Sequence, residues 1–330
     1  MRNGMLCLMI ALVSSAACAA PRTWELREGG RWQEVDKPTT QAVREPTLDQ
    51  AERHLAADEI SRAKDLLVPW IKANPASPVR DRAIFLLGEA NFRKGDRVQA
   101  FYNFDELLDR YVASPYFNRA LQRQYDIADA YLSGFKNKFL GIRILSGVDE
   151  AIEMLYRVQQ RAPGSPAAEK ALLRTADYYY ENGDSELASD AYAAYVRSYP
   201  RSPNVPKVRL RQAFSALRQF RGTKFDATPV IDARQQLVDL AAAYPELAEK
   251  ENVKALLERI DASLAAKMIE TAAFYRRTGQ PKAAAYYYRY IMRTFPVAPE
   301  AARAKAELAS LAPEHRAETP RPPASRPANP

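Results

Sequence analysis

The chain has 330 residues, of which 47% are hydrophobic and 27% are charged, and it contains only 12 glycines. This composition is typical of a folded, helix-rich protein and excludes an intrinsically disordered chain. The formal net charge of +8 permits attraction to anionic lipids or acidic proteins. No nucleic-acid reader motif accompanies that charge, so nucleic acid is not an expected partner.

Residues 1–18 have the layout of an export signal. Arg2 precedes an apolar core at residues 5–13, and small residues suited to peptidase cleavage follow at 14–20. The apolar core is much shorter than the ~20 residues that a membrane-spanning helix needs. We therefore expect the chain to be exported and this segment to be removed.

The two cysteines, Cys7 and Cys18, both lie in this signal segment. A body without cysteine is not built on disulfides. Cys18 follows two alanines and resembles the acylated cysteine of bacterial lipoproteins, although Ser15 stands where that pattern prefers leucine. Two outcomes remain open: acylation of Cys18, which would anchor the chain to a membrane, or ordinary cleavage nearby, for instance after Ala19.

Residues 19–43 form a linker segment that is too short for a domain and contains Trp24 and Trp32. The two tryptophans either dock on the body of the protein or belong to a spacer between a lipid and the body.

Residues 44–311 carry a repeated proline pattern. A proline followed shortly by serine and proline recurs at 75–78, 163–166 and 200–203, with weaker copies near 112–115, 245 and 296–299. Proline lacks an amide donor and cannot continue a helix, but it fits the first turn of the next one. Each copy therefore marks the end of one helix and the start of another.

Between these proline turns, Gly95, Gly183 and Gly279 close the first helix of a pair. Small residues recur where paired helices must cross closely: Gly88, Ala176 and Ala272 on the first helix, and Ala100, Ala188 and Ala284 on the second. The order helix, glycine turn, helix, proline turn is that of tetratricopeptide repeats. The sequence therefore predicts an all-α fold, a right-handed superhelical solenoid of about six helical hairpins.

Several parts of the body depart from a regular repeat. We expect a degenerate first hairpin, extra residues near 134–147 and 221–228, a long helix over 246–278, and a closing helix near 299–311. Residues 312–330, rich in proline and small polar residues, are predicted to be a disordered tail.

The sequence contains no recognisable catalytic centre. His54 and His315 are the only histidines, the body has no cysteine, and no phosphate-binding glycine loop or nucleophile elbow is present. Without cysteine, zinc and thiol sites are not expected. We predict that the protein is not an enzyme and has neither a cofactor nor a metal site.

Residues 197–224 contain eight basic residues and no acidic one. On a helix, four of them fall within a stripe of about 80°: Lys207, Arg211, Arg218 and Arg221. This basic stripe is either a docking face for an acidic partner or lipid headgroups, or a solvated face that lacks acids.

Consecutive tyrosines at 178–180 and 286–288 form a second unusual feature. Three consecutive residues on a helix point in three directions, so at least one of each set must leave the core. By the repeat register, seven side chains should line the concave groove as partner-binding residues: Arg82, Phe85, Glu89, Phe92, Leu173, Asp177 and Tyr180. Tyrosine suits partner recognition, and packing within the repeats is the alternative.

Together with the export signal and Cys18, the repeats resemble the BamD family. The stretches that carry the resemblance are LLGEANFRKGD and YVASPYFNRAL, at 86–96 and 111–121, and residues 264–308. The resemblance implies a scaffold on the periplasmic face of the outer membrane, anchored by lipid at Cys18. Its implied partners are the central subunit of the β-barrel insertion machinery and unfolded outer-membrane proteins.

The main alternative is a periplasmic tetratricopeptide scaffold that coordinates envelope constriction or peptidoglycan synthesis. Proteins of that kind usually carry a coiled coil before their repeats, and none is visible in this sequence. If Cys18 is not acylated, we expect the chain in the soluble periplasm.

Overall fold

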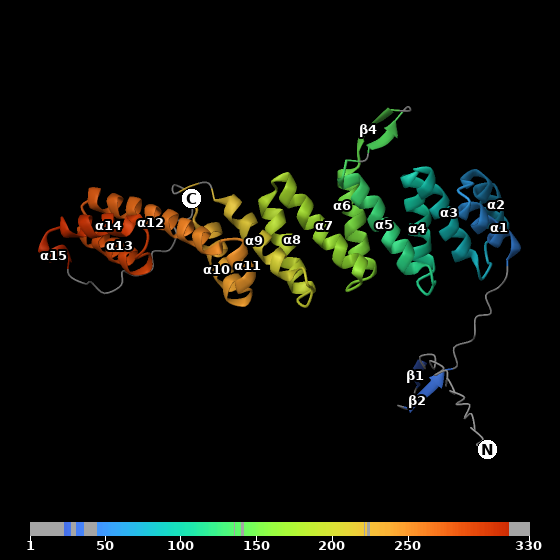
Figure 1. Ribbon diagram of the computed structural model, residues 1–330, viewed down its shortest axis with the longest axis horizontal. Helices are drawn as coiled ribbons and strands as arrows, with labels where there is room; N and C mark the ends of the chain where they lie inside the picture. Colours follow the sequence, from blue (N-terminus) through green and yellow to red (C-terminus); the bar gives the residue numbers. More distant parts are fainter. Residues whose placement is uncertain are drawn as a thin grey trace, which may run out of the picture. The chain divides into compact units, whose positions relative to one another are not determined.

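The computed structural model describes residues 23–27, 31–35, 45–134, 136–139, 142–220, 222 and 225–316. The chain divides into two compact units, Met1–Arg80 and Asp81–Pro330. Figure 1 shows the helices and strands of both units.

The first unit contains a β-hairpin and a helical hairpin. Strands β1 (Thr23–Arg27) and β2 (Arg31–Val35) pair antiparallel, within the segment that the sequence marked only as a linker. Helices α1 (Pro46–Ala56) and α2 (Ile60–Ala73) pack against each other. Ala51 of α1 and Ala63 and Leu67 of α2 are fully buried, so even this degenerate hairpin has an apolar contact face.

The described part of the second unit consists of helical hairpins that follow one another along the chain (Figure 1). The hairpins are α3 (Arg80–Lys94) with α4 (Arg97–Arg110), α5 (Phe117–Leu132) with α6 (Val148–Arg161), α7 (Pro166–Asn182) with α8 (Ser185–Ser198), α9 (Val205–Gln219) with α10 (Thr228–Ala243), and α12 (Val253–Arg277) with α13 (Pro281–Thr294). A closing helix, α14 (Pro299–Ala309), packs on α13. The predicted all-α tetratricopeptide fold is confirmed.

The glycine turns have the backbone geometry that the sequence predicts. Gly95, Gly183 and Gly279 have φ values of 83°, 89° and 74°, a region in which a side chain would be strained. In each turn the amide of the following residue donates to the carbonyl five residues earlier, as Asp96 does to Asn91 at 2.9 Å. This bond satisfies a carbonyl that the helix end leaves unpaired.

Serine hydroxyls of the proline turns accept backbone amides just before or at the start of the next helix. The hydroxyl of Ser165 accepts the amide of Ala168 at 3.2 Å and forms the N-cap of α7. Ser77, Ser114 and Ser202 each accept the amide two residues further on. The serine of the repeated pattern is therefore a turn residue and, at Ser165, a capping residue.

Helices α3 and α4 cross closely at Gly88. The ring of Phe104 on α4 is fully buried, and a Cβ built on Gly88 would lie 2.6 Å from the nearest atom of that ring. In later hairpins the same position holds Ala176 and Ala272, which are both fully buried.

Three segments differ from the sequence prediction. The extra residues of the third hairpin form two antiparallel strands, β3 (Lys136–Phe139) and β4 (Ile142–Ser146). The continuous helix predicted over 246–278 is wrong, because α11 (Pro245–Lys250) and α12 are separated at Asn252, whose φ is 50°. Asparagine tolerates this left-handed conformation better than most residues. The tail predicted from residue 312 begins with a short helix, α15 (Pro313–Arg316).

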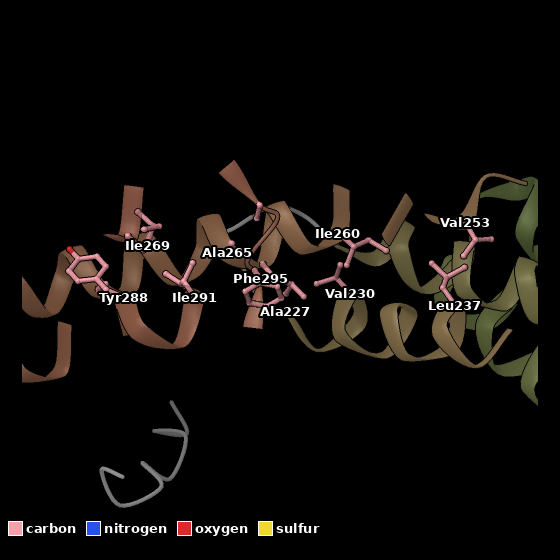
Figure 2. Close-up of a cluster of buried hydrophobic side chains, with 14 of the residues drawn as sticks. Ala227, Val230, Leu237, Val253, Ile260, Ala265, Ile269, Tyr288, Ile291 and Phe295 are labelled. Atoms are coloured by element: carbon pink, nitrogen blue, oxygen red, sulfur yellow. The ribbon is translucent and has the colours of Figure 1, made fainter. Parts of the chain in front are cut away.

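The largest buried cluster lies along α12. Its side chains come from α9, α10, α11, α12, α13 and α14, and Figure 2 shows part of the cluster as a row of side chains from Tyr288 to Val253. With 25 residues, α12 is long enough to pack against both α10 and α14. One core therefore joins the last two hairpins to the closing helix, as expected when each repeat buries the apolar face of its neighbour.

Candidate functional site

Helices α7 and α9 bring together residues from both of the unusual features in the sequence. Asp177 and Tyr180, from the predicted groove, meet Arg211 and Arg218, from the basic stripe. Arg211 forms an ion pair with Asp177. The guanidinium carbon of Arg218 lies 4.1 Å from the centre of the Tyr180 ring, and its Nη1 donates to the Tyr180 carbonyl at 2.8 Å. We call these four residues the Tyr180 cluster.

The repeat length explains why these side chains meet. Asp177 and Arg211 are 34 residues apart, which is the length of one tetratricopeptide unit. They therefore occupy the first helices of two successive hairpins. Tyr180 lies one helical turn after Asp177, and Arg218 lies two turns after Arg211, so each pair shares one face of its helix.

A hydrogen bond from the buried Tyr192 holds the carboxylate of Asp177 in place. The Tyr192 hydroxyl donates to Asp177 Oδ1 at 2.6 Å, and the Tyr192 side chain is fully buried. Burial raises the pKa of Tyr192, and its hydrogen bond to Asp177 raises it further. Burial acts to lower the pKa of Arg211, but the hydrogen bond and charge of Asp177 outweigh it and the pKa is raised. At neutral pH the tyrosine is thus a neutral donor and the arginine a cation.

Tyr192→Phe is expected to lower the free energy of unfolding by about 0.5–1.5 kcal/mol, because it removes one donor from Asp177 without changing the packed volume. Chemical denaturation measures this change. Tyr102→Phe is the matched control, since Tyr102 is 62% exposed and its loss of a hydroxyl should leave stability unchanged. Equal midpoints for the two variants would mean that the hydrogen bond to Asp177 contributes nothing measurable.

The same arrangement occurs two hairpins earlier. Arg123 of α5 donates to both carboxylate oxygens of Glu89 on α3, from Nε at 2.6 Å and from Nη2 at 2.9 Å. Its guanidinium carbon lies 4.7 Å from the centre of the Phe92 ring. The hydrogen bond to Glu89 is the main cause that raises the pKa of Arg123. Glu89, Phe92 and Arg123 have the same spacing as Asp177, Tyr180 and Arg211.

A third ion pair links the intervening helices. Arg174 of α7 donates to Asp129 of α5 at 2.6 Å. Ion pairs therefore connect the first helices of four successive hairpins, α3, α5, α7 and α9. In each pair the acid lies on the earlier helix and the arginine on the later one.

Two predicted groove residues are almost fully buried. Phe85 is 2% exposed and stacks on Tyr116, with ring centres 4.9 Å apart, and Glu89 is 4% exposed. The following hairpin covers both side chains, so neither is available to a partner. Arg82 and Leu173 are half-buried, and Leu173 packs against the core of α7, α8 and α9.

The basic stripe is partly engaged inside the protein. Arg211 is half-buried against Asp177, whereas Lys207 and Arg218 are exposed. Arg221 and Cys18 lie outside the described residues. The exposed part of the candidate surface therefore consists of Lys207, Arg218 and the half-buried ring of Tyr180.

A groove of about 610 Å³ lies next to the Tyr180 cluster and shares Arg218 with it. Its walls are the turn between α7 and α8, the end of α9, and the loop at 225–229. Leu187 and Phe225 line it and are 50% and 55% exposed. Sequence reasoning missed this groove, although the insertion near 221–228 that supplies Phe225 was the signal for it.

The described residues show no further chemical centre. In this part of the chain, no three His, Cys, Asp or Glu side chains are grouped so that they could hold a metal ion. His54 Nδ1 lies 2.6 Å from Glu59 Oε2, so its ring contacts the turn between α1 and α2. None of the described helices has the length and apolar composition needed to cross a bilayer.

One protein-family model matches this chain. The family model YfiO, outer membrane lipoprotein, matches residues 146–325, which is more than half of the 330 residues. No curated protein matches the chain.

Solved structures similar to this chain are tetratricopeptide proteins. The C-terminal part of one from Cytophaga hutchinsonii is 14% identical, with 78% of this chain and 86% of that chain covered and a TM-score of 0.38. Another, from Parabacteroides merdae, is 12% identical, with 80% and 96% covered and a TM-score of 0.36.

Proposed function

This chain belongs to the YfiO family of outer membrane lipoproteins, which is the BamD family that its sequence resembles, and we propose that it is a periplasmic scaffold of the outer membrane. It binds proteins of the β-barrel assembly machinery and helps to fold and insert outer-membrane proteins. The observation that carries this proposal is the family match over residues 146–325. The stacked helical hairpins support it, because such repeats present extended surfaces to protein partners.

Attachment to the outer membrane comes from lipid on Cys18 in this proposal. Each acyl methylene that is buried in the bilayer contributes about 0.8 kcal/mol. The repeats then lie on the periplasmic face, with the linker at 19–43 between lipid and body. The proposed role is that of a protein-binding scaffold without catalytic activity.

We assign partner binding to the face formed by Tyr180, Lys207 and Arg218. Lys207 and Arg218 are exposed cations of α9, and Arg218 lies 4.1 Å from the centre of the Tyr180 ring. The adjoining groove offers the apolar side chains of Leu187 and Phe225. Tyrosine and arginine are enriched at the centres of protein interfaces. Exposed positive charge favours association with acidic segments, so the proposed partner contributes an acidic surface with apolar residues beside it.

Lys207→Glu combined with Arg218→Glu is expected to reduce recovery of partner proteins several-fold, because a reversed rim charge slows association and repels an acidic surface. Arg211 is left intact, since its loss would leave Asp177 without its ion pair. Quantitative pull-down measures the effect, with circular dichroism to show unchanged helicity.

The control is Lys254→Glu combined with Lys305→Glu, which reverses two exposed lysines on α12 and α14. This variant changes the net charge by the same amount at a different place. If both double variants recover partners equally well, the basic stripe is a solvated face.

Cross-linking in cells, followed by identification of the attached proteins, tests the proposed function as a whole. Recovery of the β-barrel insertion complex supports it. Recovery of cell-wall synthesis enzymes instead selects the scaffold for envelope constriction or peptidoglycan synthesis. Recovery of neither group overturns both assignments.

A further inference from the structure

Six aromatic rings form a continuous series from the end of α12 along α13. Their centres are separated in turn by 5.7, 5.5, 5.6, 6.4 and 6.4 Å, in the order Phe274, Tyr275, Tyr287, Tyr286, Tyr290 and Phe295. Tyr275 and Tyr287 are stacked, with an angle of 13° between their rings. We call this series the aromatic ladder.

Part of the ladder is accessible at the surface. Of the tyrosine run at 286–288, only Tyr288 is fully packed in the core, with 1% exposure. Phe274 is 52% exposed, the four tyrosines of the ladder are half-buried, and Phe295 is buried. Rows of partly exposed aromatic rings are uncommon on a protein surface and are typical of binding sites.

A groove adjoins the far end of the ladder. It has a volume of about 450 Å³ and is lined by Phe295, by the turn that follows it, and by α12 residues at 255–262 that include Glu258, Arg259 and Asp261. Val297, in that turn, is 83% exposed. The ladder and this groove together offer a path that an extended chain could follow.

The chain itself contains a segment with matching chemistry. Residues 317–330 include five prolines and two arginines among 14 residues. Proline-rich segments bind aromatic-lined grooves in the polyproline II conformation, because that conformation is preformed and little entropy is lost on binding. Arginine adds favourable contacts with tyrosine faces.

Chain connectivity places the start of this segment close to α13. Helix α15, which directly precedes it, packs on α13, and Arg276 near the end of α12 pairs with Glu307 of α14. The chain therefore leaves α14 beside the Phe274 and Tyr275 end of the ladder. In polyproline II conformation the segment spans about 43 Å at ~3.1 Å per residue, whereas the 14 residues of α13 span about 21 Å at ~1.5 Å per residue.

We propose that residues 317–330 dock on the aromatic ladder of α13, so that the chain carries its own proline-rich ligand for this face. The tether gives the segment an effective concentration on the order of 1 mM.

Fluorescence anisotropy with a labelled peptide of residues 317–330 tests this proposal. We expect saturable binding to the chain shortened after Arg316. Apparent binding to the full chain should be about tenfold weaker for a peptide Kd of about 0.1 mM, because the tethered copy competes at ~1 mM. A peptide in which all five prolines are alanine should bind at least tenfold more weakly to the shortened chain. Absence of binding to the shortened chain, or equal binding to both chains, overturns the proposal.

Substitutions in the ladder locate the binding site. In the shortened chain, Tyr286→Ser with Tyr290→Ser should weaken peptide binding at least fivefold, and Phe274→Ser should weaken it independently. Tyr156→Ser is the matched control, since Tyr156 is 59% exposed on α6 and belongs to another surface. Thermal melts verify that each variant is folded, and undiminished binding by the folded ladder variants rules out this site.

Discussion

Gly88→Leu is expected to lower the free energy of unfolding by about 1–3 kcal/mol, and it is the substitution with the largest expected effect on stability. A Cβ at this position would already lie 2.6 Å from the ring of Phe104, and leucine adds three more carbons. Phe104 is fully buried, so its ring has no free space into which it can turn. The two helices must separate, and apolar contacts along the α3–α4 interface are lost.

Thermal and chemical denaturation measure this effect. Lys94→Leu is the control, because Lys94 is exposed at the end of the same helix, where leucine is as good a helix former as lysine. Gly88→Ala should shift the midpoint in the same direction by a smaller amount. An unaltered melting temperature for Gly88→Leu contradicts the assignment of residue 88 to the helix crossing.

Cys18→Ala is expected to move the protein from the outer-membrane fraction to the soluble periplasm. A single acyl chain gives only marginal membrane binding, and stable anchoring needs two chains or a second signal. Removal of the attachment residue removes all of this apolar contribution at once. Cell fractionation followed by immunoblotting measures the distribution.

The control for this experiment is Cys7→Ala, which changes the other cysteine of the signal segment and should leave the distribution unchanged. Export must be verified for both variants from the size of the processed chain. If Cys18→Ala stays in the membrane fraction, the lipid attachment is disproved, while the protein-binding role is still tested by cross-linking.

The helical hairpins could be predicted because their boundaries are encoded locally. Gly95 and Gly183 mark turns that need a positive φ, and Pro166 lies at the first turn of α7. The break at Asn252 could not be predicted in the same way. It carries no glycine or proline, its neighbours are good helix formers, and its backbone conformation depends on how α11 and α12 pack against α10.

The candidate site could be predicted only in part. The repeat register predicted that Asp177 and Tyr180 line the groove. The lack of acidic residues over 197–224 indicated a basic stripe that includes Arg211 and Arg218. Neither pattern indicated that the two pairs of residues would be in contact. Their contact depends on the alignment of α7 with α9, two helices that are not adjacent in sequence. An acid followed by an arginine after 34 residues is the pattern in the sequence that indicates this contact.

The groove beside the Tyr180 cluster could not be predicted from the sequence, for a different reason. Repeat patterns describe what successive hairpins share, whereas Phe225 belongs to an insertion that has no counterpart in the other hairpins. The burial of Phe85 could not be predicted from the repeat register, because the register of a single hairpin places this side chain in the groove, whereas the next hairpin covers it. Side chains at such positions can be judged only when both neighbours are known.

The equivalent placement of one arginine in successive hairpins allows the array to change length without losing its ion pairs. Joining Tyr111 to Pro200 deletes two hairpins and brings Arg211 to the place of Arg123, where it can neutralise Glu89. Joining Tyr111 to Pro163 deletes one hairpin and brings Arg174 to the same place, because Arg123, Arg174 and Arg211 occupy equivalent positions of α5, α7 and α9. Growth or shortening by whole hairpins therefore keeps a cation opposite this buried carboxylate, whose loss of a counterion would be strongly unfavourable.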